Sequence, residues 1–237
     1  MGLSCTDAKE RRALVQSYFL RQHMLWGEET QELLATKSIL IVGSGGLGCS
    51  VALALSGSGI GRVDLVDFDR VEEHNIHRQV LFGSEDEGKY KAEIASLKIK
   101  KRNPILKSTA YIADFETFIK ENEQKYDLII DATDNLFVRE QIDNYAKENS
   151  IAWIYGSVEE FNGQVCLFRE ASFSMFATKE VETKGIAAPM VMQVASFEAN
   201  LALRYLAKLK VASDIFYYLY YNDSGEFAMK KFKLPKE

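Results

Sequence analysis

Short apolar runs alternate with amphipathic stretches along the first two thirds of the chain. Apolar runs bounded by glycine or charged residues are typical of buried strands, and apolar positions three or four residues apart are typical of helices. This pattern predicts strands over 37–43, 62–67, 107–112, 126–131 and 151–155. It predicts helices over 7–26, 47–58, 89–101 and 136–148. Such alternation favours right-handed crossovers and a mainly parallel sheet.

The pattern changes after residue 156. A long helix is expected over 190–210, and the aromatic and apolar runs around it predict antiparallel strands over 164–169, 216–221 and 227–234. The expected fold class is therefore α/β, with a doubly wound, mainly parallel Rossmann-like sheet and a small antiparallel C-terminal extension.

The length of 237 residues fits one domain with an elaboration. We expect this domain to have three parts: an N-terminal helical segment over 1–36, a Rossmann-like core over 37–160, and a completing segment over 161–237. The completing segment would contain a crossover loop, the long helix and the antiparallel strands.

Composition excludes several classes of protein. Hydrophobic residues make up 47% and charged residues 27% of the chain, so disordered and fibrous proteins are excluded. With 29 basic and 34 acidic residues the net charge is −5, which argues against a partner such as nucleic acid. No apolar stretch approaches the 18 residues of a membrane span. Three cysteines without a Cys-x-x-Cys pair indicate a reducing compartment, so we expect a cytoplasmic protein.

A glycine-rich motif follows the first predicted strand directly and precedes a predicted helix. Its sequence, GSGGLG, satisfies G-x-G-x-x-G with the glycines Gly43, Gly45, Gly46 and Gly48. Glycines at these positions let a turn close and let backbone amides approach a phosphate group. Asp67 ends the next strand, 19 residues after the last glycine, where an acid accepts hydrogen bonds from ribose hydroxyls. The motif alone predicts a nucleotide site.

Further polar residues favour a triphosphate over a nicotinamide dinucleotide. Cations occur in HNIHRQ over 74–79 and in KYK over 89–91, and an acidic motif, DATDN, occupies 131–135. Hydride transfer does not require several cations beside the nucleotide, whereas a departing pyrophosphate must have its growing charge neutralised. An aspartate at the carboxyl end of a strand is well placed to hold magnesium on such phosphates.

Four motifs in this order resemble the ThiF/MoeB/HesA adenylyltransferases, which are bacterial relatives of ubiquitin-activating enzymes. The motifs are GSGGLG over 43–48, VDFDRVEEHNIHRQ over 66–79, GKYK over 88–91 and DATDN over 131–135. The resemblance extends over about 17–234, which is nearly the whole chain.

The resemblance implies ATP and Mg²⁺ as ligands and assigns roles to particular residues. Asp67 would bind the adenosine ribose, and Asp134 would coordinate magnesium. Arg21 would reach the γ-phosphate in the other subunit, so a homodimer is implied; the family's usual Arg-Tyr is replaced by Tyr18-Phe19 here. The implied catalytic residues are Arg78, Lys91, Asp134 and Arg21. The implied nucleotide-binding residues are Gly43, Gly45, Gly46, Gly48, Asp67, Asp69, Asn75, Gln79 and Asn135.

The implied reaction is attack by a protein's C-terminal carboxylate on the α-phosphorus of ATP. The product would be an acyl-adenylate, pyrophosphate would leave, and the expected partner is a ubiquitin-like sulfur carrier ending in Gly-Gly, threaded beneath a loop near 170–186. No side chain needs to act as nucleophile, because alignment and charge stabilisation suffice.

Two departures from the family pattern limit this chemistry. The first zinc-binding Cys-x-x-Cys pair falls on residues 171–174, which read ASFS, so we expect no zinc. The acceptor cysteine of the crossover loop falls near 181–182, which reads VE, and no cysteine follows Cys166. We therefore expect activation to stop at the adenylate.

Three alternatives remain at this point. An NAD-dependent oxidoreductase would also use the glycine motif but leaves the residues over 75–79 unexplained. A non-catalytic subunit of a split activating heterodimer would not need Arg78, Lys91 and Asp134 together. Within the family, a tRNA base or a peptide C-terminus is an alternative substrate to a sulfur carrier.

Overall fold

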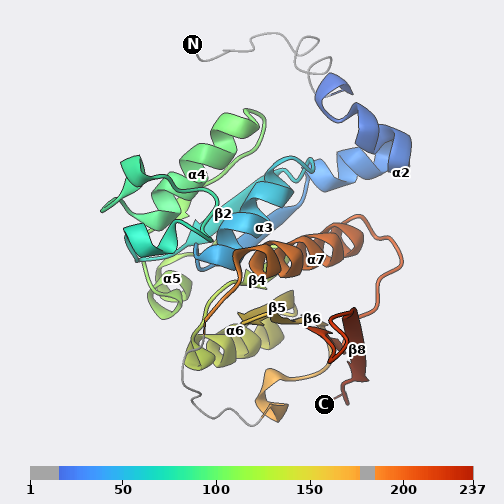
Figure 1. Cartoon of the computed structure of the whole chain (residues 1–237). Coiled ribbons are helices and arrows are strands. Elements are labelled where there is room, and N and C mark those ends of the chain that lie inside the picture. Colours follow the sequence, from blue (N-terminus) through green and yellow to red (C-terminus); the bar gives the residue numbers. More distant parts are fainter. Residues whose placement is uncertain (1–15, 177–184, 237) are drawn as a thin grey trace.

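Within the described residues, eight strands form one sheet in the order β3-β2-β1-β4-β5-β6-β7-β8 (Figure 1). The computed structural model describes residues 16–176 and 185–236. The strands are β1 (Ser38–Val42), β2 (Arg62–Val66), β3 (Ala110–Tyr111), β4 (Leu128–Asp131), β5 (Ala152–Glu159), β6 (Asn162–Phe168), β7 (Ile215–Tyr221) and β8 (Phe227–Lys233). The expected mixed sheet, parallel first and antiparallel at the C-terminal end, is confirmed.

The strand order reverses between β1 and β4. Val42, the last residue of β1, pairs with Val66 on one side and with Asp131 on the other, and both pairings are parallel. The segments that follow these three strands therefore leave the sheet at the same edge. In doubly wound sheets this point of reversal is where ligands bind.

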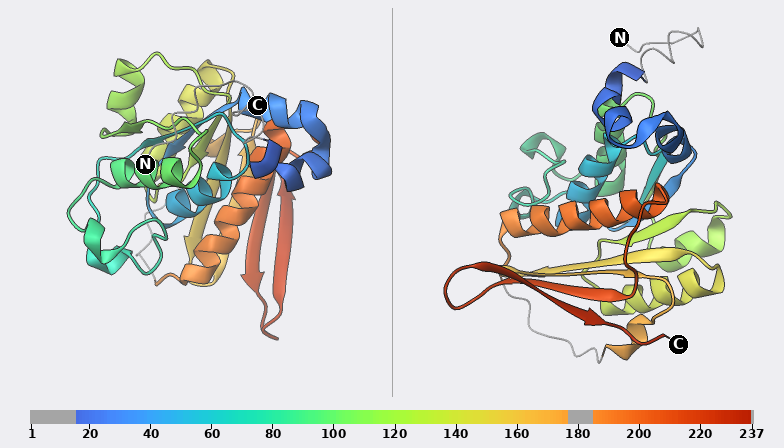
Figure 2. Two further views of the ribbon diagram at one scale, coloured as in Figure 1. Left: turned by 90° about the horizontal axis from the view of Figure 1, so that it is seen from above. Right: turned by 90° about the vertical axis from the view of Figure 1, so that its right-hand side faces the viewer.

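The antiparallel half begins earlier than the sequence suggests. β5 does not stop near residue 155 but continues through Gly156 to Glu159. It continues beyond its pairing with β4 because β6 pairs with it from Trp153 to Glu159. β7 and β8 then complete the sheet as a hairpin (Figure 2).

Helices cover both faces of the sheet. Alternate residues of β1 belong to different cores: Ile39 and Ile41 pack with α3, α4 and α7, and Leu40 and Val42 pack with α5 and α6. Figure 2 shows α7 lying across one face of the sheet. The helices are α2 (Leu20–Ala35), α3 (Gly46–Ser56), α4 (Lys91–Arg102), α5 (Phe115–Glu121), α6 (Leu136–Glu148) and α7 (Ala188–Leu206), with short 3₁₀ turns η1 (Glu73–Asn75), η2 (Ser84–Asp86) and η3 (Phe173–Met175).

The N-terminal helix differs from its prediction. We expected it to end near Trp26, but α2 resumes after a break at Gly27, where φ is 82°, and continues to Ala35. The continuation forms because Gln31 and Leu34 are buried against the body of the protein. Residues 7–15 of the expected helix lie outside the described residues, and within the described ranges no helix is long and apolar enough to cross a bilayer.

Candidate active site

The glycine motif forms a tight turn between β1 and α3. Gly43 has a φ of 93° and donates its N–H to the Val66 carbonyl at 2.8 Å. A Cβ at this position would lie 2.7 Å from the Ala132 carbonyl oxygen, and one at Gly48 would overlap the Gly43 carbonyl oxygen. Both glycines are therefore required for the chain to turn back between two neighbouring strands.

The start of α3 is open to an anion. This eleven-residue helix begins after Gly45, which has no side chain to cap the first amide groups. A side chain at Gly46 would also be tightly packed, because its Cβ would lie 3.0 Å from a methyl group of Val191 in α7. Beside the turn, the buried Ser44 hydroxyl and the Gln79 amide oxygen have no hydrogen-bond partner within the described structure. Uncapped amides and unpartnered polar atoms fit a phosphate group.

Asp67, which follows β2, organises the glycine turn. Its Oδ2 accepts a hydrogen bond from the Ser44 backbone N–H at 2.5 Å, and its Oδ1 accepts one from the Asp69 N–H at 2.7 Å. Burial raises the pKa of this carboxyl group above its usual value. The sequence predicts a ribose contact here, but it did not reveal that the same carboxylate holds the turn.

Arg78 lies beside the turn after a short 3₁₀ segment. Its guanidinium donates to Asn75 Oδ1 at 2.8 Å. Its side chain passes close to Gly46, because a Cβ built on that glycine would lie 3.5 Å from the Cγ of Arg78. Gln79, only 3% exposed, faces Gly45. The structure thus brings the predicted residues of this segment to the glycine turn.

Lys91 and Asp69 form an ion pair at the start of α4. The Nζ–Oδ2 distance is 2.9 Å, and the lysine side chain is 8% exposed whereas the aspartate side chain is 53% exposed. The Lys91 backbone N–H also donates to the Asp69 carbonyl oxygen at 2.9 Å. The two residues, predicted separately, form one unit in which the carboxylate fixes the position of the ammonium group.

The acidic motif places its last two residues differently. Asp134 is exposed after β4, at the same edge as the glycine turn. Asn135 is the N-cap of α6, because its Oδ1 accepts hydrogen bonds from the N–H groups of Phe137 and Val138 at 2.9 and 3.3 Å. An asparagine before an apolar helix is itself a capping signal. Only its amide nitrogen is left for the predicted nucleotide contact.

A buried ion pair beneath this motif was not predicted. Arg139 Nε lies 2.9 Å from Asp131 Oδ2, and the two side chains are almost wholly buried. Asp131 Oδ1 also accepts from the Thr133 N–H and hydroxyl groups, at 2.9 and 2.7 Å, and Arg139 donates to the Thr133 carbonyl oxygen at 2.6 Å. The pair therefore fixes the backbone immediately before Asp134. Helical periodicity cannot reveal it, because the partners come from a strand and a helix.

Arg21 is not part of the site in its own chain. It is exposed on α2, and the neighbouring Gln22 donates to the Gly57 carbonyl oxygen at the carboxyl end of α3. The glycine turn lies at the other end of this helix, and eleven residues at 1.5 Å each make about 16 Å.

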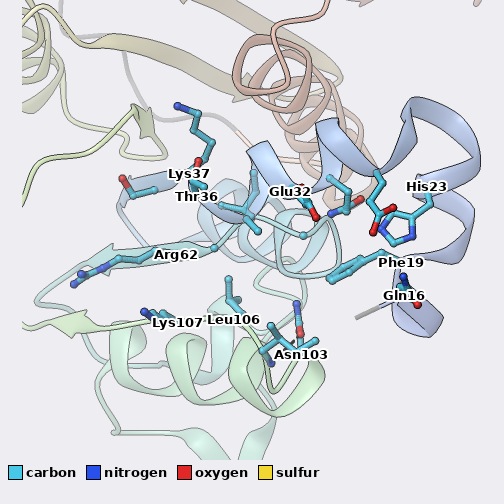
Figure 3. A pocket seen from close by; sticks show the side chains of 18 of the residues that line it. Gln16, Phe19, His23, Glu32, Thr36, Lys37, Arg62, Asn103, Leu106 and Lys107 are labelled. Carbon is cyan, nitrogen blue, oxygen red and sulfur yellow. Dashed lines mark hydrogen bonds between the residues drawn. The ribbon is translucent and has the colours of Figure 1, made fainter. Parts of the chain in front are cut away.

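A cavity of about 640 Å³ lies at this opposite edge of the sheet (Figure 3). It separates α2, with His23 and Glu32, from Arg62 at the start of β2 and from Lys107. Arg62 is engaged by Asp64 at 2.6 Å. Because ligands of doubly wound sheets bind at the carboxyl ends of the strands, this cavity is separate from the candidate active site.

The segment that replaces a zinc-binding pair is held by carboxylates. Asp143 Oδ2 accepts from the Ser172 hydroxyl at 2.8 Å and from the Phe173 N–H at 3.0 Å, and Asp214 accepts from the Ala171 N–H. Among the described residues no group of three His, Cys, Asp or Glu side chains could hold a metal ion. The absence of zinc stays a prediction, and residues 181–182 of the crossover loop lie outside the described residues.

Comparison with known proteins gives a consistent picture. A sulfur carrier protein adenylyltransferase of Thermus thermophilus is 38% identical over 146 residues, which are 60% of this chain and 53% of the relative. This chain therefore spans about half the length of that relative. A molybdopterin-synthase adenylyltransferase of Haemophilus influenzae is 30% identical over 217 residues, covering 86% of this chain and 88% of the relative.

Solved structures share the fold. The crystal structure of E. coli MccB with ATP superposes with a TM-score of 0.80 at 20% identity, covering 92% of this chain and 72% of that chain. PaaA superposes with a TM-score of 0.80 at 22% identity, covering 98% and 75%. The ThiF family model matches residues 19–237, from α2 through the glycine turn to the antiparallel strands, and this chain therefore belongs to the ThiF family.

Proposed function

We propose that this chain is an ATP-dependent adenylyltransferase that activates the C-terminal carboxylate of a small ubiquitin-like sulfur carrier. The observation that carries the proposal is the uncapped start of α3 with Arg78 beside it. A second cation, Lys91, is held by Asp69, whose backbone N–H binds the same Asp67 carboxylate that holds the glycine turn. The relatives named as sulfur carrier protein and molybdopterin-synthase adenylyltransferases support the substrate class. We also propose that the protein acts in the cytoplasm.

In the proposed reaction a carrier carboxylate oxygen attacks the α-phosphorus of ATP. The new P–O bond replaces the bond to the β-phosphate, and pyrophosphate leaves with the electron pair. The first amides of α3 would receive phosphate oxygens, while Arg78 and Lys91 would neutralise the charge that grows on the leaving group. Asp67 would accept hydrogen bonds from the ribose, and Gln79 has a free amide oxygen beside the turn.

Magnesium fits the donors at this edge. Asp134 is exposed where the triphosphate would lie, and Mg²⁺ is commonly held by one or two carboxylates together with substrate phosphates. When bound, the ion would neutralise phosphate charge. Asp131 does not share this role, because its side chain is completely buried and its carboxylate is paired with Arg139.

The acyl group would stay on AMP until an external nucleophile arrives. Burial raises the pKa of Cys49 to about 12, and burial likewise raises the pKa of Cys166, so both described cysteines are neutral thiols. Neither thiol is accessible to a carrier. Besides the missing cysteine of the crossover loop, these two cysteines are therefore also expected not to accept the acyl group, so activation should stop at the adenylate.

We further propose a homodimer in which Arg21 serves the partner's site. Its position at the far end of α3 is incompatible with a role beside its own glycine turn. A role for Arg21 in catalysis therefore requires a second copy of the chain.

Pyrophosphate exchange tests the proposed reaction. We expect ATP–pyrophosphate exchange to depend on a Gly-Gly-ending carrier and to be lost with the same carrier lacking its last glycine, because the attacking carboxylate is then displaced by about one residue, roughly 3.5 Å. Each carrier in a panel is compared with its shortened form. Exchange that is equally fast with both forms, or absent with every carrier, contradicts the proposed substrate.

Nucleotide protection distinguishes the oxidoreductase alternative. We expect ATP with Mg²⁺ to raise the melting temperature and NAD to leave it nearly unchanged, because at equal concentration the ligand that binds the folded state more tightly stabilises it more. The measurement is a thermal shift at matched nucleotide concentrations. Stronger protection by NAD than by ATP would favour hydride transfer.

A further inference from the structure

Glu198, near the middle of α7, is a buried carboxyl group that the proposed reaction does not use. Its exposed fraction is 0%, and within the described structure neither carboxyl oxygen has a hydrogen-bond partner. An ionised carboxylate without partners is very costly in a protein interior, so such a group takes up a proton instead.

The carboxyl group of Glu198 occupies a notch in the sheet. Gly156 of β5 has no side chain, and a Cβ at this position would overlap Glu198 Oε1 and lie 2.9 Å from Oε2. The glutamate thus fills the space that the glycine leaves, and the fit depends on both residues. At this notch α7 packs against the part of β5 that extends beyond its pairing with β4.

Two charged residues act on Glu198. The carboxylate of Asp131 disfavours a second negative charge, and the guanidinium of Arg139 favours it. Arg139 is already engaged by Asp131 at 2.9 Å, by the Thr133 carbonyl oxygen at 2.6 Å and by the Gly156 carbonyl oxygen at 3.3 Å. Two buried carboxyl groups therefore share one cation, and Asp131 holds it.

The other elements packed against α7 offer no compensating charge. α3 and β6 contain no charged residue, and the only one in β5 is Glu159 at its end. Apart from Glu159, their titratable groups are Cys49, Tyr155 and Cys166, and burial raises the pKa of these three. Burial, together with the charge of Asp131, raises the pKa of Glu198 well above its usual value.

We propose that Glu198 carries a proton in the folded protein, and that loss of this proton to solvent weakens the Arg139–Asp131 pair and loosens the backbone at Thr133 and Asp134. The new carboxylate would compete with Asp131 for the single guanidinium. Because that guanidinium also holds the Thr133 carbonyl oxygen, the change would reach the segment that carries the proposed magnesium ligand. Glu198 is in this sense a positioning residue that makes the site sensitive to alkaline pH.

The effect on stability has a definite sign. In the unfolded chain Glu198 ionises near its ordinary pKa of about 4.3, whereas the folded protein keeps the proton to higher pH. The stabilisation is fully present below about pH 4.3 and is lost as pH rises toward the folded-state pKa. Across this window one extra proton is bound by the folded state, so the unfolding equilibrium constant rises about tenfold per pH unit from this group alone.

Glu198→Gln tests the protonation, because glutamine has nearly the shape of a protonated glutamate. We expect the ratio of the unfolding constants of the wild type and the variant to rise with pH, by up to about tenfold per unit, in denaturant titrations from pH 5 to pH 9. Glu121→Gln, at an exposed position at the end of α5, is the matched control and should follow the wild type. Parallel curves for wild type and Glu198→Gln would refute the protonation.

Hydrogen exchange tests the link to the site without nucleotide or metal. The Thr133 N–H donates to Asp131 at 2.9 Å, so its protection reports the state of the ion pair. After correction for intrinsic exchange, we expect this protection to fall at alkaline pH in the wild type and to stay constant in Glu198→Gln. Equal protection in both proteins would overturn the link while leaving the protonation intact.

A double-mutant cycle keeps the inference testable if Glu198→Gln does not fold. Gly156→Ala should destabilise the wild type, because its Cβ overlaps the carboxyl group and the buried Glu198 side chain has to shift. The same substitution should cost much less in the Glu198→Ala background, where that space is empty. Additive effects would show that the carboxyl group does not occupy the notch.

Discussion

Arg78→Ala is expected to lower carrier-dependent ATP–pyrophosphate exchange by about 10²–10³-fold, because a preorganised cation that stabilises transition-state charge contributes on this scale. Its guanidinium is held by Asn75 at 2.8 Å beside the uncapped start of α3, so little reorganisation is needed when charge develops. The measurement is the exchange rate at saturating ATP and carrier. The loss should lie in the rate constant more than in the ATP concentration at half-saturation.

The control for Arg78→Ala separates local from general charge effects. Lys100→Ala removes an exposed cation near the carboxyl end of α4, away from Lys91, and should leave the exchange rate unchanged. Arg78→Lys keeps the charge but not the planar guanidinium, one nitrogen of which donates to Asn75, so it should recover only part of the activity. Full exchange by folded Arg78→Ala would remove this residue from the proposed catalytic group.

Arg139→Met is expected to lower the free energy of unfolding by about 3–5 kcal/mol, because it leaves the Asp131 carboxylate buried without its cation. Asp131 has 0% side-chain exposure, so water cannot take the place of the guanidinium. The Thr133 carbonyl oxygen loses a donor at the same time. The measurement is urea denaturation at neutral pH, with the midpoint and slope reported separately.

Two further variants interpret the Arg139→Met result. Adding Asp131→Asn removes the stranded charge and should recover part of the lost stability, since replacing both partners costs less than removing one. Lys120→Met breaks the exposed Lys120–Glu116 pair on α5 and should have little effect, because solvent screens such pairs. A destabilisation by Arg139→Met no greater than that by Lys120→Met would show that the buried pair is not ionic.

The parts of this fold that the sequence predicts are those with a clear local pattern of apolar and polar residues. The run over 39–42 is apolar throughout, and these strand residues are buried on both faces as such runs require. The run around β3 is mixed, and only two of the six expected residues form a strand, because the sheet ends there. α5 was not expected, since its seven residues are too few for a clear helical period.

Some of the site residues could likewise be assigned from the local sequence, and others only from the tertiary structure. Glycines 43 and 48 are dictated by the turn that the sequence motif describes, because a Cβ at either would collide with backbone. From the sequence, Asn135 can be interpreted either as a nucleotide ligand in the acidic motif or as the N-cap of the following helix. The structure shows that it is the N-cap. Lys91 and Asp69 are 22 residues apart, and their pairing depends on how α4 returns to the sheet edge.

The sequence by itself determined the alternation of strands and helices, the glycine turn and the polar residues that directly follow each strand, since each depends on neighbours along the chain. The tertiary structure decided that Arg21 lies at the far end of α3 and that Asp131 pairs with Arg139. It also decided that Glu198 fills the notch at Gly156. These features depend on packing between elements distant in sequence, and burial there sets whether a carboxyl group is charged.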